Sequence, residues 1–241
     1  MLKQDAITPL YVQLMEELET SIRNGVYKPG DKIMTEAEMA KEYGVSLITV
    51  RKAVGSLMEK GLVVRKQGKG TFVTKPKYSR NMKKLQSFTE MCEQMGVKPG
   101  AQVLENRLIM ADKKVADRLG IEPGSNVVYI SRLRLADGEP VQVEKSYFPL
   151  KYAFLLEEDL NNGSMFECLK EKAGAKVASS EKMIELCRAT AEEAALMDVK
   201  KGDYLLFVKS TAYDENGEPM YAGIQLINGD RFSLYVYESG E

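Results

Sequence analysis

The 241-residue sequence contains no histidine. This absence excludes Ser-His-Asp and Cys-His catalytic groups, zinc sites with imidazole ligands, and histidine acid–base chemistry. An enzyme with this composition would have to use carboxylates, Lys, Tyr or Arg alone. We therefore expect a protein that is not an enzyme and that has no catalytic residues.

Cysteine is scarce as well, and Cys92, Cys168 and Cys187 lie far apart in no CxxC pair. This spacing argues against a disulfide framework or a cysteine metal site, so we expect buried thiols in a reducing cytoplasm. Apolar runs such as residues 205–208 are far shorter than the ~18 residues that span a bilayer, and the first residues lack a signal-peptide core. The sequence predicts a cytoplasmic protein with no membrane partner, metal or cofactor.

Positive and negative charges are unevenly distributed along the chain. Residues 1–84 hold 16 basic and 9 acidic side chains, a net charge of +7, while residues 85–241 hold 18 and 26, a net charge of -8. Residues 46–84 contain 11 basic side chains and a single acid, Glu59. Such a concentration is typical of a surface that binds a polyanion, although a solvated basic face explains the charge equally well.

Caps and apolar spacing in residues 1–75 predict three helices. Thr8 is expected to cap a first helix that ends near Gly25. Residues 35–38 form a capping box for a second helix, and Ser46 can cap a third helix that ends at Gly61. The short connection between the second and third helices is typical of a helix-turn-helix.

The third predicted helix and the hairpin after it carry groups that suit DNA. Thr49, Arg51 and Lys52 lie opposite the apolar stripe, where they can meet bases and phosphates in a major groove. Gly68 and Gly70 mark a hairpin tip, where glycine permits positive φ and close approach to a sugar-phosphate edge. A glycine pair alone is usually a plain turn, but its position after a basic helix-turn-helix favours a DNA-contacting wing.

The segment from Pro9 to Val73 resembles the winged helix-turn-helix domain of GntR-type bacterial transcription regulators. Residues 49–53, 59–62 and 68–73 carry the most specific matches. The resemblance implies binding to double-stranded operator DNA as a homodimer. With the charge pattern, it indicates these DNA-binding residues: Thr35, Glu36, Ser46, Thr49, Arg51, Lys52, Lys66, Gly68, Lys69, Gly70 and Thr71.

Two positions depart from the family pattern at the starts of the second and third helices. Ala37 and Leu47 stand where the family commonly has arginine. Arginine recognises guanine through O6 and N7, and each such arginine–guanine contact favours guanine over the wrong base by ~1 to 3 kcal/mol. We therefore expect DNA binding without the family's operator consensus.

The remaining sequence predicts a linker and a second domain. Residues 76–84 are polar and basic without apolar periodicity, which is typical of a linker. Within residues 85–241, residues 115–124 are echoed by residues 193–202, and each segment is a short helix that runs into a turn. An apolar strand and a second turn follow each segment. Two helix-strand-hairpin units predict the α+β class, with a mixed domain around an antiparallel sheet.

An anion pocket is predicted in this second domain. Arg132 and Arg134 share one face of a predicted strand, and Glu144 lies roughly opposite Arg132 across a hairpin. Capping boxes at residues 87–90 and 164–167 begin two helices, whose N-termini favour a phosphate or carboxylate. A cross-strand salt bridge on a solvated face and ordinary helix capping are the open alternatives.

Residues from about 85 to the end resemble the UTRA effector domain of the HutC subfamily. The resemblance is carried by residues 85–89, the strand over 130–135, the hairpin that ends near Pro149, and residues 229–232. It implies a dimerising domain with the fold of chorismate lyase but without its activity, and a pocket for sugar phosphates or similar small anions. The pocket residues that it implies are Ser87, Phe88, Thr89, Arg132, Arg134, Glu144, Ser164 and Phe166.

Two pocket positions differ from regulators of this kind that sense amino-sugar phosphates. Tyr221 replaces a glutamate and Ile227 replaces a tyrosine. Loss of the carboxylate removes the natural partner of a ligand ammonium group, which argues against glucosamine 6-phosphate. We expect a more apolar or aromatic pocket, lined in part by Tyr221, that still holds an anion.

The combined features predict a transcriptional repressor. A homodimer is expected to bind a near-palindromic operator and to be released by a small anionic metabolite. The alternative is a lyase-like enzyme that uses Arg132, Arg134 and Glu144 and has a nucleic-acid anchor. An activator or a non-specific DNA-binding protein is a further alternative.

Overall fold

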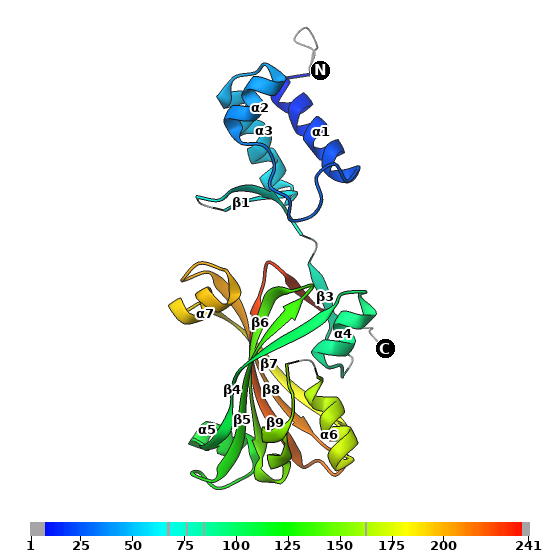
Figure 1. The fold of residues 1–241 in the computed structure, drawn as a ribbon, viewed down its shortest axis with the longest axis vertical. Helices are drawn as coiled ribbons and strands as arrows, with labels where there is room; N and C mark the ends of the chain where they lie inside the picture. Colours follow the sequence, from blue (N-terminus) through cyan, green and yellow to red (C-terminus); the bar gives the residue numbers. More distant parts are fainter. Residues whose placement is uncertain (1–7, 67, 76, 84, 162, 238–241) are drawn as a thin grey trace. The chain divides into compact units, whose positions relative to one another are not determined.

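The computed structural model describes residues 8–66, 68–75, 77–83, 85–161 and 163–237. The chain forms two compact units, residues 1–76 and residues 77–241, and each unit has its own hydrophobic core (Figure 1).

The first unit is a three-helix domain followed by a β-hairpin. Its elements are α1 (Leu10–Arg23), α2 (Glu36–Tyr43), α3 (Leu47–Glu59), β1 (Val63–Lys66) and β2 (Gly70–Val73). Helix α1 packs on α3 through side chains such as Leu14, Leu18, Val50 and Leu57, all of which are buried. Because each buried side chain of this size contributes about 1.5 to 3 kcal/mol, this core positions α3 firmly.

Side-chain caps define the starts of α2 and α3. The Thr35 hydroxyl accepts a hydrogen bond from the Glu38 amide, and the Glu38 carboxylate accepts one from the Thr35 amide, which confirms the predicted capping box. Ser46 caps α3 by accepting from the Thr49 amide. Between the two helices Gly44 has a φ of 62°, a left-handed conformation in which a side chain would be strained.

Helix α1 begins one residue later than a Thr8 cap would require, so that prediction is wrong. Pro9 occupies the N-cap position and provides no side-chain cap, while the Thr8 carbonyl accepts a hydrogen bond from the Gln13 side chain. The fixed φ of proline suits the extended N-cap position as well as the first helical position, so the sequence pattern alone did not separate the two.

The hairpin after α3 is short and antiparallel. Val63 pairs with Val73, and Lys66 pairs with Gly70 at the tip. Gly68 and Gly70 have φ values of 73° and 122°, so both glycines adopt conformations that other residues rarely adopt.

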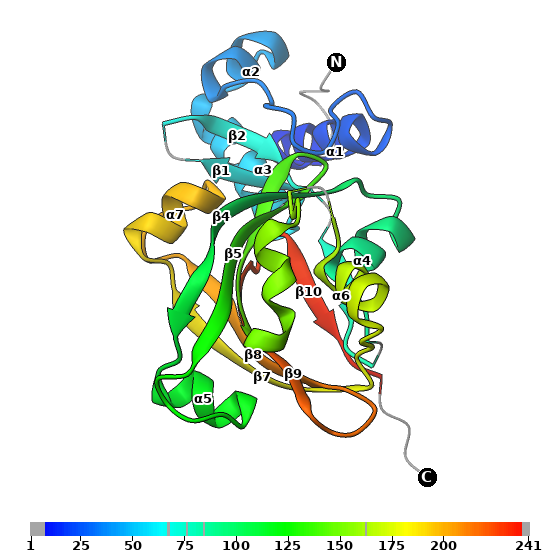
Figure 2. The same cartoon turned by 60° about the horizontal axis from the view of Figure 1, so that its bottom comes forward.

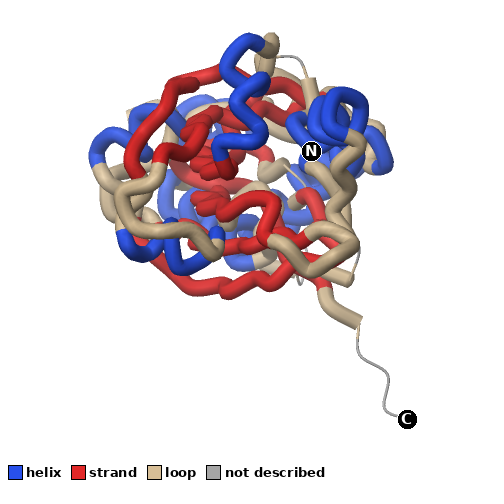
Figure 3. The backbone as a smooth tube through the Cα atoms, turned by 90° about the horizontal axis from the view of Figure 1, so that it is seen from below, coloured by secondary structure: helices blue, strands red, loops and turns tan. Residues whose placement is uncertain are grey.

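A six-stranded antiparallel sheet forms the second unit, in the order β4-β5-β6-β9-β8-β7. The strands are β4 (Pro99–Met110), β5 (Asn126–Ala136), β6 (Glu139–Pro149), β7 (Ser179–Arg188), β8 (Tyr204–Tyr213) and β9 (Pro219–Asn228). The helices are α4 (Phe88–Gln94), α5 (Lys113–Leu119), the 3₁₀ segment η1 (Leu150–Glu157), α6 (Met165–Ala173) and α7 (Ala191–Met197). Helices α4 and α6 lie on one side of the sheet and α5 and α7 on the other (Figures 1 and 2), and the strands are bent rather than straight (Figures 2 and 3).

The predicted repeat is present in this sheet. Helix α5 leads into the hairpin β5-β6, and α7 leads into the hairpin β8-β9. The two hairpins meet where β6 pairs with β9, so they supply the four central strands. This arrangement confirms the α+β class and brings both halves of the repeat to one sheet face.

Part of the predicted linker is a strand instead. Residues 78–81 form β3, which pairs in parallel with β10 (Phe232–Tyr235), and the Tyr78 and Phe232 rings lie 5.2 Å apart. The linker prediction is wrong for these residues. Their pairing strand lies near the other end of the chain, and the local sequence pattern cannot indicate so distant a partner. Pro76 and Lys84, the ends of that predicted linker, lie outside the described residues.

The described residues include no helix long and apolar enough to cross a membrane. Nor do they include a group of three or more His, Cys, Asp or Glu side chains that could hold a metal ion. The three cysteines are free thiols, of which Cys92 is buried and the other two are half-buried.

Candidate functional site

The start of α3 carries two hydroxyl groups and two exposed apolar side chains. The Ser46 and Thr49 hydroxyls are 2.9 Å apart and hydrogen-bonded. Leu47 is 45% exposed and Ile48 is 76% exposed, so the first turn presents apolar groups where the family has an arginine. Apolar groups at this place can contact thymine methyl groups but cannot read guanine.

Glu36 joins α2, α3 and the hairpin through two arginines. Its carboxylate accepts a hydrogen bond from Arg51 Nε at 2.8 Å and forms a second ion pair with Arg65. The hydrogen bond from Arg51, with help from the charge of Arg65, holds the pKa of Glu36 below its usual value. Glu36 therefore orients two exposed cations. Sequence reasoning missed Arg65, although its place in the basic strand was a usable signal.

The lysines predicted to bind DNA partly pack on aromatic rings of the same unit. Lys52 Nζ lies 3.9 Å from the centroid of the Tyr11 ring, and Lys66 Nζ lies 5.4 Å from that of Phe72. Both lysines stay exposed, so their charges remain available at the surface. The other predicted wing residues are at the β1-β2 tip: Gly68, Lys69, Gly70 and Thr71.

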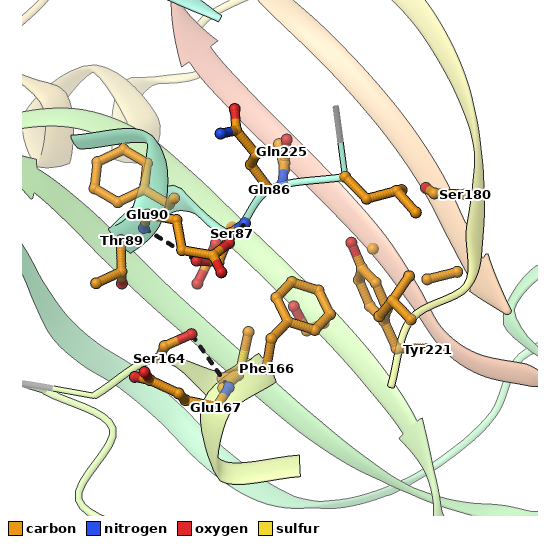
Figure 4. A pocket seen from close by; sticks show the side chains of 18 of the residues that line it. Gln86, Ser87, Thr89, Glu90, Ser164, Phe166, Glu167, Ser180, Tyr221 and Gln225 are labelled. Atoms are coloured by element: carbon orange, nitrogen blue, oxygen red, sulfur yellow. Dashed lines mark hydrogen bonds between the residues drawn. The ribbon is translucent and has the colours of Figure 1, made fainter. Parts of the chain in front are cut away.

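A cavity of about 360 Å³ lies in the second unit, between the sheet and helices α4 and α6 (Figure 4). Its floor comes from β5, β6, β8 and β9, and its walls include residues of β3 and β7. The nine residues predicted to bind the effector all line it: Ser87, Phe88, Thr89, Arg132, Arg134, Glu144, Ser164, Phe166 and Tyr221.

Arg132 and Glu144 form a buried ion pair at one side of the cavity. They are directly paired across β5 and β6, and Arg132 Nε donates to Glu144 Oε1 at 2.7 Å. Arg132 Nη1 donates to the carbonyls of Leu160 and Gly163, each at 3.1 Å. With 3% exposure for the arginine and 6% for the glutamate, a solvated salt bridge is ruled out. The pair holds the chain before α6 in place.

Arg134 is the cation of the cavity with unsatisfied donors. Nη2 donates to the Thr89 hydroxyl at 3.2 Å, whereas Nε and Nη1 are buried without a hydrogen-bond partner among the described residues. Glu144 Oε1 is 3.8 Å from Nη1, too far for a hydrogen bond. Burial lowers the pKa of Arg134 to about 10 and Glu144 opposes the shift, so the group stays charged at neutral pH.

The two helix N-termini at the cavity differ. Ser87 and Glu90 form the predicted capping box, with bonds of 3.1 Å and 2.7 Å. Ser164 accepts from the Glu167 amide at 3.4 Å, but the reciprocal bond between these residues is absent, so the second box is incomplete. Ser164 has a ψ of 122° instead of the 163° of Ser87, which turns its amide away from the usual geometry. Helix α4 has only seven residues, so Arg134 is the stronger anion-binding feature.

Aromatic rings form the opposite part of the cavity. Tyr221 stacks on Phe148 with ring centroids 5.6 Å apart and meets the Phe166 ring edge-on at 5.4 Å. Its hydroxyl bonds with the Ser210 hydroxyl at 3.1 Å, and burial raises the pKa of Tyr221, so it stays neutral. Gly223 makes room for this ring, because a Cβ there would lie 2.6 Å from Tyr221 Cε2.

Several polar residues that sequence reasoning missed also line the cavity. They are Arg80, Ser146, Lys170, Lys176, Ser180, Lys182 and Gln225. Arg80 lies on β3, in the segment that had been predicted to be a linker, so no strand pattern indicated that it faces a pocket. Figure 4 shows Gln225 and Ser180 across the pocket from Ser164 and Glu167.

Two family models match the chain. The model for bacterial regulatory proteins of the gntR family matches residues 10–73, and the UTRA domain model matches residues 94–233. The chain belongs to the GntR family. It is a DNA-binding transcriptional regulator with a UTRA domain, and the cavity lies in the UTRA domain.

Similar proteins include two regulators of Bacillus subtilis (strain 168). The chain is 35% identical over 237 residues to the uncharacterized HTH-type transcriptional regulator YurK, with 98% of both chains covered. It is 34% identical over 235 residues to the HTH-type transcriptional repressor NagR, with 98% of this chain and 96% of NagR covered. The crystal structure of PhnF from Mycobacterium smegmatis is similar with a TM-score of 0.68 at 25% identity, over 94% of this chain and 99% of PhnF.

The buried Arg132–Glu144 pair generates a stability prediction. Glu144→Gln would leave Arg132 buried without a countercharge, which is expected to cost about 3 to 5 kcal/mol of unfolding free energy. Glu105→Gln is the matched control, because its carboxylate pairs with the exposed Arg107 and should change stability by about 0 to 1 kcal/mol. Urea denaturation measures both variants. Equal stability of the two would contradict the structural role given to the pair.

Proposed function

We propose that this GntR regulator is a repressor, and that a small anionic ligand in the UTRA cavity releases it from its operator. The observation that carries the ligand part is Arg134, a buried cation with two donor nitrogens that have no hydrogen-bond partner among the described residues. A phosphate or carboxylate would satisfy those donors, which otherwise remain desolvated at a cost. The repressor part is supported by the similarity to NagR, which is named a transcriptional repressor.

DNA binding is proposed to use the start of α3 and the β1-β2 wing. The exposed cations Arg51, Arg65, Lys52 and Lys66 would neutralise phosphates, while the first turn of α3 would meet base edges in the major groove. Glu36 would keep Arg51 oriented before DNA arrives. Two such units in a homodimer would bind half-sites about one helical turn apart, so we propose a near-palindromic operator.

Release follows if the ligand binds more tightly to a dimer arrangement that does not fit the two half-sites. Such a ligand shifts the equilibrium only by its differential affinity for the two arrangements. Residues 85–241 are proposed to carry both the dimer contacts and the ligand site.

An enzyme related to chorismate lyase is the second candidate, and the cavity does not favour it. Glu144 would be the natural general base among the predicted pocket residues, but Arg132 already holds its carboxylate. The relatives named above are also called regulators or repressors. Turnover of a bound ligand by the purified chain would support the enzyme instead.

Arg51→Ala is expected to weaken binding to a duplex selected by the wild-type protein by about tenfold or more. One lost phosphate contact should also reduce the slope of log K against log salt by about 0.9. Fluorescence anisotropy across a salt series measures both. Arg23→Ala removes another exposed arginine of the same unit and is the control. Equal effects of the two substitutions would contradict the proposed DNA face.

Arg134→Gln is expected to abolish ligand release while leaving DNA affinity within about twofold of wild type. A thermal-shift screen of phosphorylated sugars and small acids identifies the ligand, since a specific ligand stabilises the folded protein by mass action. Arg107→Gln, which changes an exposed arginine of the same domain, should be released normally. Normal release of Arg134→Gln would refute the anion pocket.

A further inference from the structure

Arg80 and Lys182 are two cations of the cavity wall that the site around Arg134 does not use. Arg80 comes from β3 and Lys182 from β7, yet both line the same cavity. Arg80 Nη1 donates to the neutral amide oxygen of Gln225 at 3.0 Å. Within the described part of the chain, neither cation forms a salt bridge with a carboxylate.

The charge of Arg80 disfavours the charged form of Lys182. Burial lowers the pKa of Arg80, and burial together with the charge of Arg80 lowers the pKa of Lys182. The charge of Glu144, which Arg132 already holds, offsets part of this effect for Arg80, and among the described residues neither cation has a carboxylate of its own in a salt bridge. An anion that binds between them would remove this penalty, which a neutral ligand group cannot do.

The two cations differ in their distance from Arg134 across the sheet. Gln225, the partner of Arg80, is directly paired with Glu144 of β6, whereas Lys182 lies on the edge strand β7. Arg134 is on β5, whereas Lys182 pairs with Ser210 of β8 on the edge strand β7. Four strand steps separate β5 from β7, and at about 4.8 Å per step this corresponds to roughly 19 Å between Cα positions along the sheet. Gln225, the partner of Arg80, also lies across the pocket from Ser164 in Figure 4.

We propose that Arg80 and Lys182 form a second anion subsite, and that the effector carries two acidic groups. One group would bind Arg134 and Thr89, and the other would bind Arg80 and Lys182. This inference rests on the proposed function, because it assumes that the cavity binds the effector. A phosphorylated sugar acid has the required chemistry, since a hydroxylated chain joins its phosphate to a carboxylate.

Other groups that line the same cavity suit such a chain. Ser146 offers a hydroxyl, and Phe166 and Tyr221 offer ring faces and edges on which carbon-bound hydrogens of a sugar chain can pack. A cavity of about 360 Å³ lies within the usual range for small-molecule sites.

The second subsite also bears on how the ligand affects DNA binding. The second unit begins at residue 77, so Arg80 lies on the strand that immediately follows the DNA-binding unit in the chain. A ligand acid on Arg80 would therefore act on β3, whereas an acid on Arg134 acts on β5. A ligand with two acidic groups would therefore contact both β3 and β5.

The test compares 6-phosphogluconate with sorbitol 6-phosphate by isothermal titration calorimetry on the full chain. The two probes differ only in that a carboxylate of the first is a hydroxymethyl group in the second. Wild-type protein is expected to bind 6-phosphogluconate at least about tenfold more tightly. Arg80→Gln and Lys182→Gln should each reduce this preference to about twofold or less, with sorbitol 6-phosphate binding unchanged.

Lys114→Gln is the control, because it removes an exposed lysine of α5 that does not line the cavity, and it should keep the preference. Similar affinities of wild-type protein for the two probes, or a full preference in both Arg80→Gln and Lys182→Gln, would overturn the second subsite. The proposed function fails separately, if Arg134→Gln binds both probes as wild type does. Absence of 6-phosphogluconate binding to wild-type protein would overturn the two-acid effector. Unchanged melting temperatures and DNA affinity show that each variant is folded.

Discussion

The buried pair between Arg132 and Glu144 is the constraint on which the UTRA cavity depends. It crosses the central hairpin β5-β6, and the same guanidinium binds the carbonyls that precede α6. One ion pair thus fixes the sheet face and the helix that covers it. Because Glu144 is committed to Arg132, it lies too far from Arg134 to accept a hydrogen bond from it. The geometry that stabilises the cavity also leaves it with a cation whose donors are not all satisfied among the described residues, and the proposed anion site rests on this cation.

Local sequence signals predicted much of this structure. The capping box at Thr35, the cap at Ser46 and the glycine hairpin tip are short-range patterns, and each appears at the expected position. The pairing of Arg132 with Glu144 followed from hairpin register, which a short turn determines. The internal repeat predicted the two hairpins that form the centre of the sheet.

Features that depend on distant contacts could not be predicted in this way. The sequence left open a salt bridge between Arg132 and Glu144 on a solvated face, whereas the pair is internal because α6 and the chain before it cover the sheet. Arg80 faces the cavity because β3 pairs with β10. No local pattern in this polar, basic segment predicts a pairing strand so distant in the sequence. Lys182 reached the same cavity on an edge strand whose neighbouring positions are mostly exposed. That the predicted pocket residues contact a ligand is still a prediction.

Ligand binding and DNA binding are proposed to be two events that are coupled through one chain. The β3 strand links them physically, since it follows the DNA-binding unit directly and contributes Arg80 to the cavity. Coupling requires that ligand and operator favour different arrangements of the proposed dimer, and any such coupling is reciprocal. The first unit keeps its own core, so the ligand need not alter the helix-turn-helix itself.

Because the coupling is reciprocal, the proposed release of operator DNA by the ligand can be tested by measuring ligand affinity. The ligand found by thermal shift is titrated by calorimetry into the free protein and into the protein saturated with its operator duplex. The account predicts that operator DNA weakens ligand affinity by the same factor by which the ligand weakens DNA affinity, typically 5- to 150-fold. Equal ligand affinities with and without DNA would contradict it.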